Sequence, residues 1–418
     1  MIARLRWTIK KWMRRLWVRV TFIAMLGVAS ALVAHPLAPL PLVPPDIAWK
    51  MGAQSVGQIL TILASSLLAI ATFSLSTLIS SYNAAASSTT PRITTLLRQD
   101  SSAQNALGTF VGGFLFSLAG IIGMGAGLYN DSGKLVLFLV TLIVVGWLVA
   151  TFLTWIHMLP RLGRVEESIH LITTTARQAL ENRYQNPLLG GQAANGATKG
   201  RYTVQASRSG YIAAIDVATL ETSAQAMDTP IYLSVSPGSW IYTGSPLLSV
   251  DILPDEQSSN RLRESFIVES FRTHEQDPRY GLVVLAEIGM KALSPGVNDP
   301  GTAIQVLAMQ EQVLAVWARR QLEELPEPKY PHVFVPPLDS ADLFEDAFAG
   351  LARYGAGDFS VMLRLQKVLL ALFHQGDASF RQAAREQSAM ALKRCAKTDL
   401  LAEELERIGA IAAQMELY

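Results

Sequence analysis

The chain has 418 residues, of which 50% are hydrophobic and only 17% are charged. Soluble domains carry about 25% charged residues, so this composition indicates a membrane-embedded part. The formal net charge of +1 excludes nucleic acid or another polyanion as a partner of the chain as a whole. The single cysteine excludes an intrachain disulfide, and the six histidines lack ligand-like spacing, so we expect neither a metal nor a cofactor.

Four long apolar stretches precede residue 160, at about 17–34, 54–80, 108–128 and 135–157. Each approaches or exceeds the ~20 residues needed to cross a bilayer. The first stretch has an alternative interpretation, because a basic start followed by apolar residues and Ala29-Ser30-Ala31 also fits a cleaved signal peptide. We favour a retained helix, which gives a basic N-terminus (1–16) and a transmembrane domain (17–157).

Basic residues between the apolar stretches predict the orientation. Arg92 and Arg98 lie between the second and third stretches. Arg161 and Arg164 follow the fourth, whereas the other two connections each carry one lysine offset by an aspartate. The positive-inside rule places the N-terminus and everything after residue 158 in the cytoplasm of a bacterium, with the spans in the inner membrane.

A polar stripe runs along the second stretch if that stretch is helical. Seven amide or hydroxyl side chains fall within one arc of about 100°: Gln58, Thr61, Ser65, Thr72, Ser76, Ser80 and Asn83. Leucines occupy the opposite face, and the stripe is about 38 Å long at 1.5 Å per residue. Two interpretations remain open: the stripe lines a path for an ion or solute, or it is a packing face whose hydroxyls bond to their own helix.

The third stretch contains seven glycines between residues 108 and 127. Gly108 and Gly112, and Ala119, Gly123 and Gly127, repeat every four residues, which allows membrane helices to approach closely. This spacing predicts close packing, either within one protomer or between protomers.

The remainder of the chain predicts a soluble α+β region. We expect a connecting helix (158–184), a linker (185–200), a small barrel-like β domain (201–252), a helical hairpin (262–325, beginning with a helix at 262–275) and a helical C-terminal domain (340–418). SPGSWIYTGSPLLSV resembles a strand pair of biotinyl and lipoyl carriers, but the loop expected at the hairpin tip (221–230) has no lysine. A swinging-arm carrier is therefore excluded, and an interaction module fits better.

Two Asp-Pro pairs predict helix starts, because aspartate is a favoured N-cap and proline a favoured first helical residue. These are Asp277-Pro278 and Asp299-Pro300. Between them, Ser294-Pro295-Gly296 ends the first helix, with the glycine in a left-handed conformation. We interpret the segment, including Asn298, as a structural corner. The alternative is a site that binds a ligand on the exposed amides.

RTHEQDPRYGL and ALSPGVNDPGTA (272–282 and 292–303) resemble a widespread bacterial family of predicted integral membrane proteins of unknown function. SGYIAAID and the second stretch running into TTPRITTLL are similar to it as well. The resemblance extends from about residue 54 to the C-terminus. It implies a membrane topology and supplies no chemistry.

No nucleophile elbow, phosphate loop or zinc helix occurs in the sequence, and we do not expect an enzyme. Glu287 and Lys291 have the spacing of an ion pair on one helix face. His274, beside Glu275, is a candidate pH-sensitive latch.

The sequence thus favours a homo-oligomeric channel or conduit in the lipid bilayer, with the second stretch along the path and the cytoplasmic domains gating or assembling it. The alternative is a membrane-anchored scaffold or sensor whose cytoplasmic part binds a ligand or partner. A secondary transporter ranks third, because the apolar stretches after Arg19 contain no charged residue to couple ions.

Overall fold

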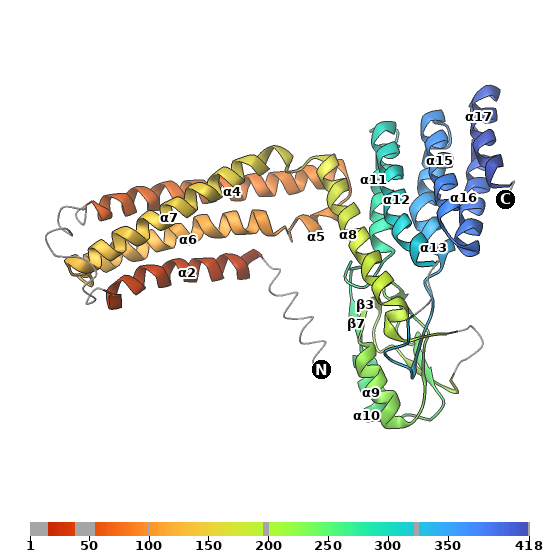
Figure 1. The fold of residues 1–418 in the computed structure, drawn as a ribbon, viewed down its shortest axis with the longest axis horizontal. Coiled ribbons are helices and arrows are strands. Elements are labelled where there is room, and N and C mark those ends of the chain that lie inside the picture. Colours follow the sequence, from red (N-terminus) through yellow and green to blue (C-terminus); the bar gives the residue numbers. More distant parts are fainter. Residues whose placement is uncertain (1–15, 38–54, 99, 195–199, 322–325, 417–418) are drawn as a thin grey trace. The chain divides into compact units, whose positions relative to one another are not determined.

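The computed structural model describes residues 16–37, 55–98, 100–194, 200–321 and 326–416 (Figure 1). The chain folds into two compact units, of which the first ends at Glu167 and the second begins at Ser168. Nearly all of the predicted basic N-terminus and the proline-rich connection before the second stretch lie outside the described residues.

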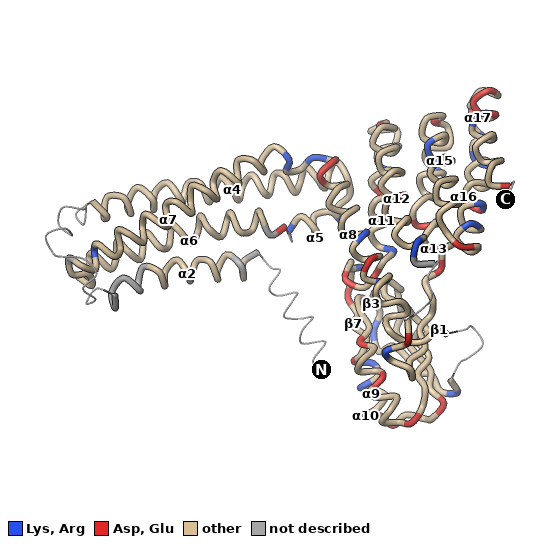
Figure 2. Tube along the Cα trace, in the orientation of Figure 1, with Lys and Arg blue, Asp and Glu red and all other residues tan. Residues whose placement is uncertain are grey.

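The first unit is built from long helices. These are α2 (Leu16–Leu37), α4 (Val56–Ser88), α6 (Ser101–Gly125) and α7 (Asp131–Met158), with the short α5 (Ile93–Leu97) and η1 (Leu159–Arg161). Three helices are long and apolar enough to cross a membrane, at Val56–Ser88, Ser102–Gly125 and Ser132–Arg161. They match the second, third and fourth apolar stretches, and Figure 2 shows that the charged residues along these helices lie near the helix ends.

Helix α2 is less clear as a span. It is helical over 22 residues, but its described apolar part, Val20–Ser30, is shorter than a membrane crossing. A fourth transmembrane helix therefore stays a prediction.

Glycines let the helices of the first unit pack closely, as the third stretch predicted. A Cβ atom at Gly112 would lie 3.0 Å from the backbone oxygen of Ile23 in α2. On another face of α6, a Cβ at Gly113 would lie 2.9 Å from Leu67 of α4. The glycine spacing is therefore used within one protomer.

Most of helix α8 (Val165–Gln185) belongs to the second unit, and it matches the predicted connecting helix. Eight short strands follow: β1 (Gln192–Ala193), β2 (Tyr202–Gln205), β3 (Gly210–Ile215), β4 (Ile231–Leu233), β5 (Trp240–Ile241), β6 (Pro246–Val250), β7 (Phe266–Glu269) and β8 (Val333–Val335). They form a five-stranded mixed sheet in the order β1-β8-β4-β6-β2 and a three-stranded antiparallel sheet in the order β5-β3-β7.

Strands lie within the predicted β domain (201–252) and also outside it, and they form two sheets. Strands β1 and β8 pair in parallel, so the expected linker contributes a strand and residues far along the chain complete the sheet. The helix expected at 262–275 is wrong, because only α10 (Glu256–Glu264) is helical and β7 follows it. Pairing with β3 favours the strand, since β7 places Phe266 and Val268 opposite Ile215 and Ile212.

The loop expected at the hairpin tip is also wrong. Helix α9 (Val217–Met227) lies there, and it is stabilised by Asp216, whose carboxylate accepts hydrogen bonds from the backbone and hydroxyl of Thr219. The helix buries Leu220 and Ala224 in the β-region core. It ends at Asp228, which adopts a left-handed conformation.

Helices form the rest of the second unit, as predicted. They are α11 (Tyr280–Ala292), α12 (Pro300–Gln321), α13 (Ser340–Phe344), the π-helical turn η3 (Glu345–Ala349), α14 (Gly350–Tyr354), α15 (Phe359–Gln375), α16 (Ala378–Cys395) and α17 (Ala402–Ala412). Leu285, Leu314, Phe344, Leu369 and Phe380 are among the residues of their buried core.

Candidate functional site

The predicted polar stripe lies on the outside of the first unit. Its members are all exposed on α4: Gln58, Thr61, Ser65, Thr72, Ser76, Ser80 and Asn83. The opposite face of α4 is buried, with Leu60, Leu67 and Leu78 exposed by only 0%, 4% and 2%. Packing inside this protomer therefore uses the leucine face, and the polar face is turned away from the bundle.

The leucine face contacts α6 and α7. Leu67 and Leu78 belong to a cluster with Phe110, Leu148 and Trp155, and Leu60 belongs to a second cluster towards the N-terminal end of α4. A Cβ atom at Gly120 of α6 would lie 2.8 Å from the side chain of Leu60.

Three hydroxyls of the stripe bond to their own helix. Thr61 donates to the carbonyl of Gly57, Ser65 to that of Thr61 and Thr72 to that of Leu68, at 2.8–3.0 Å. Within the described residues, the side chains of the other four members, Gln58, Ser76, Ser80 and Asn83, make no hydrogen bond. Bonding to the helix itself thus accounts for only part of the stripe.

The corner between α11 and α12 is stabilised by hydrogen bonds among its own residues. Asp299 accepts hydrogen bonds from the backbone of Thr302 at 3.0 Å and from its hydroxyl at 2.6 Å. These bonds lower the pKa of Asp299, so the start of α12 already carries a negative charge. The backbone N–H of Asp299 donates to Ala292 at 2.7 Å, and the hydroxyl of Ser294 donates to Lys291 at 2.6 Å.

The left-handed residue of this corner is Asn298, with φ of 50°, and Gly296 has no positive φ. The expectation that Gly296 forms the left-handed cap is therefore wrong. Asparagine tolerates this conformation better than other residues with a side chain, so backbone geometry explains Asn298. Pro295 and Gly296 are exposed at the turn, and Pro300 is the first residue of α12.

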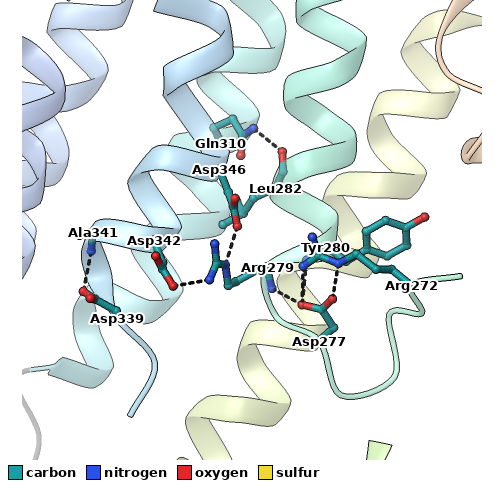
Figure 3. Close-up of polar contacts among 10 residues, drawn as sticks. All are labelled: Arg272, Asp277, Arg279, Tyr280, Leu282, Gln310, Asp339, Ala341, Asp342 and Asp346. Atoms are coloured by element: carbon teal, nitrogen blue, oxygen red, sulfur yellow. Dashed lines mark hydrogen bonds and ion pairs between the residues drawn. The ribbon is translucent and has the colours of Figure 1, made fainter. Parts of the chain in front are cut away.

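Asp277 differs from Asp299 because it is buried, with 1% of its surface exposed. Helix α11 begins at Tyr280 with Arg279 at its N-cap, so the prediction that Pro278 is the first helical residue is wrong. The carboxylate of Asp277 accepts from the backbones of Arg279 and Tyr280 at 3.0 and 3.2 Å. It also binds Arg272 through two hydrogen bonds of 2.8 and 3.1 Å (Figure 3). Burial raises the pKa of Asp277, and the hydrogen bonds from Arg272 and the two amides act in the opposite direction.

Arg279, directly after Pro278, joins α11 to the next helices. Its guanidinium binds Asp346 at 2.6 Å and also binds Asp342 (Figure 3). Burial lowers the pKa of Arg279, but these ion pairs outweigh it and raise the pKa overall. Gln310 of α12 adds a hydrogen bond to the carbonyl of Leu282 at 2.9 Å.

His274 lies against the same cluster. Its ring centroid is 4.4 Å from that of Tyr280. Burial lowers the pKa of His274 to about 4, and the charge of Arg272 acts in the same direction. The imidazole is therefore neutral at neutral pH, and a latch built on it titrates well below the usual range of histidine.

The remaining candidates are less informative. Glu287 and Lys291 are half-buried one turn apart on α11, and their pairing stays a prediction. The sequence did not single out Arg272 or Arg279 as site residues. Both arginines lie within five residues of Asp277 in the sequence. The acidic partners of Arg279, Asp342 and Asp346, lie more than 60 residues away, so residue spacing could not reveal those ion pairs. Across the described ranges, no three metal-ligating side chains come together.

Comparisons with known proteins agree with a membrane protein. The chain is 27% identical over 235 residues to an uncharacterised protein of Mycobacterium tuberculosis and to one of Mycobacterium bovis. Each match covers 51% of this chain and 43% of the relative, so the chain aligns with less than half of the relatives' length. No solved structure matches.

A family model described as "Predicted membrane protein (DUF2254)" matches residues 13–371. The resemblance read from the two Asp-Pro segments is thereby confirmed, and the chain belongs to this family of membrane proteins of unknown function.

Proposed function

We propose that the protein forms a homo-oligomer in the bacterial inner membrane and that the polar stripe of α4 faces a water-filled path between protomers. One observation carries this proposal: the stripe is exposed while the leucine face of α4 is occupied by α6 and α7. A path inside one protomer would need the reverse arrangement.

The flanks of the stripe support an assembly. Helical geometry places Ile62 and Phe73 on one side of the stripe and Leu68 and Leu75 on the other. These four side chains are 66%, 62%, 53% and 42% exposed, in that order. Apolar flanks suit contact with neighbouring protomers or lipid, and the polar stripe between them then points to the shared axis.

The free-energy cost of placing polar side chains in hydrocarbon favours contact between the stripe and water. A hydroxyl without a hydrogen bond is costly in hydrocarbon, and the side chain of Ser76 makes none within the described residues. The span from Gln58 to Asn83, about 38 Å, exceeds the ~30 Å core of a bilayer. The amides therefore lie near the two membrane surfaces, and hydroxyls line the interior. An uncharged lining gives weak ion selectivity.

We further propose that α2 is a retained fourth span and that the second unit is cytoplasmic. The close contact of α2 with Gly108 and Gly112 of α6 supports retention, and the family match begins at residue 13, before this helix. The arginines that follow α4 and α7 support the orientation. No catalytic role is proposed.

A second candidate, a membrane-anchored sensor without transport, is favoured by a different observation. The second unit holds a cavity of about 340 Å³ at the end of α8 and the start of α9. That volume suits a small ligand.

The proposed conduit is tested with purified full-length protein. We expect an oligomer in mild detergent and ionic currents in planar bilayers across voltage and membrane tension. Thr72→Val, which removes a stripe hydroxyl, should reduce the conductance severalfold by making the path more apolar. Thr77→Val makes the same change off the stripe and should leave the conductance unchanged. A monomer that never conducts would overturn the proposal.

A further inference from the structure

Arg183 is a buried arginine near the C-terminal end of α8. Its residue surface is only 7% exposed, and its Nε atom is buried without a hydrogen-bond partner. Across the described ranges, its guanidinium forms no ion pair. Burial lowers the pKa of Arg183 to about 10, with the charge of Asp277 acting in the opposite direction, so the side chain stays cationic at neutral pH.

The nearby carboxylate of Asp277 already has hydrogen-bond donors other than Arg183. Asp277 accepts two hydrogen bonds from Arg272 and two from the start of α11. The lining of the cavity beside Arg183 holds two cations, Arg183 and Lys329, and two carboxylates, Asp216 and Glu275. A buried charge without an ion pair is costly, and an anionic ligand would offset that cost.

Arg183 lines the cavity of about 340 Å³. The exposed residues Asn182, Asn186 and Lys329 also line it and add donors near its mouth. The start of α9 forms another part of the lining, through Val217 and Ala218. The first amides of a helix lack partners within the helix and attract anions.

Two carboxylates, those of Asp216 and Glu275, are also in the lining. Both oxygens of Asp216 accept hydrogen bonds from Thr219, which commits this group to capping α9. Arg183 is the buried cation of this lining, and the volume of the cavity lies at the lower end of that of small-molecule sites. That size excludes a polymer and fits one small molecule.

We propose that this cavity binds a small phosphate-bearing molecule, with the Arg183 guanidinium holding the phosphate. Arginine matches phosphate with two parallel hydrogen bonds. The proposal is independent of the conduit along α4, because it concerns residues of the second unit alone.

The test measures the thermal unfolding midpoint of the full-length protein in detergent against inorganic phosphate, at constant ionic strength. Phosphate stabilises proteins nonspecifically, so the comparison between variants is needed to distinguish binding at Arg183 from this general effect. Wild type and Arg177→Met, which removes an exposed arginine from the same helix, should show a saturable rise in the midpoint. Arg183→Met should lose the saturable part, with an apparent affinity at least tenfold lower.

The stability of Arg183→Met without phosphate shows whether Arg183 serves to bind a ligand or to stabilise the fold. Arg183→Met should be at least as stable as wild type, because an apolar side chain replaces an unpaired charge. A strongly destabilised Arg183→Met with an unchanged phosphate response would overturn the proposal, and so would the same response in all three proteins. If the methionine variant does not fold, Arg183→Lys, which keeps the charge and loses the paired donors, should weaken phosphate binding; unchanged binding would overturn the proposal.

Discussion

Replacing Asp277 with alanine is expected to lower the free energy of unfolding by about 3–5 kcal/mol, the usual cost of removing one partner from a buried ion pair. The change leaves Arg272 without its carboxylate and removes the acceptor for the two first amides of α11. The segment that connects β7 to α11 thereby loses its main polar anchor.

Asp299→Ala is the matched comparison, because it removes the same side chain from an exposed helix start. This cap contributes about 1 kcal/mol. Thermal unfolding of the full-length chain in detergent should show a shift for Asp277→Ala at least three times that for Asp299→Ala. Equal shifts would mean that the ion pair with Arg272 adds nothing to a simple cap.

Gly238→Ala is expected to be the second severe change, because this glycine lies against Asp277. It has φ of 92°, and an added Cβ would lie 2.7 Å from Oδ1 of Asp277 and closer still to Oδ2. A non-glycine residue in that backbone conformation costs about 1–3 kcal/mol. The steric overlap adds a further cost of about 1–3 kcal/mol and displaces the carboxylate from Arg272.

Gly244→Ala separates the cost of backbone strain from the cost of the steric overlap with Asp277. Gly244 has nearly the same φ, 88°, but an added Cβ meets nothing within 4 Å. Its substitution should therefore cost only the backbone strain, and the difference in unfolding midpoint between the two variants measures the clash with Asp277. A Gly244→Ala protein as unstable as Gly238→Ala would show that strain alone is responsible.

Local signals in the sequence predicted much of this structure. The apolar length of the spans, the two faces of α4 and the aspartates before prolines all act within one helix or its first turn. Each was therefore readable from residue spacing. The stripe was predicted to oppose the leucines at 60, 63, 67 and 78; three of them are buried and Leu63 is half-buried.

Long-range contacts could not be read in the same way. Strand β7 depends on pairing with β3, and β8 joins its sheet from more than 80 residues away. The arginines around Asp277 were visible in the sequence, but their burial and their partners in α13 and η3 depend on tertiary packing. Asn298 took the left-handed position of its turn, where glycine was expected at position 296, because both residue types tolerate that conformation.

The water exposure of the α4 stripe is the most direct test of the proposed conduit. Ser65→Cys, Thr72→Cys and Ser76→Cys, each in a Cys395→Ser background, should react in membranes with a small water-soluble thiol reagent. Leu60→Cys, Leu67→Cys and Leu78→Cys should be protected by packing against α6 and α7, and Phe73→Cys, on the apolar flank, should be protected by lipid or a neighbouring protomer. Reaction at the stripe positions alone is the predicted result. Equal protection of the stripe, leucine and flank positions would mean that the stripe is dry and would contradict a water-filled path along α4.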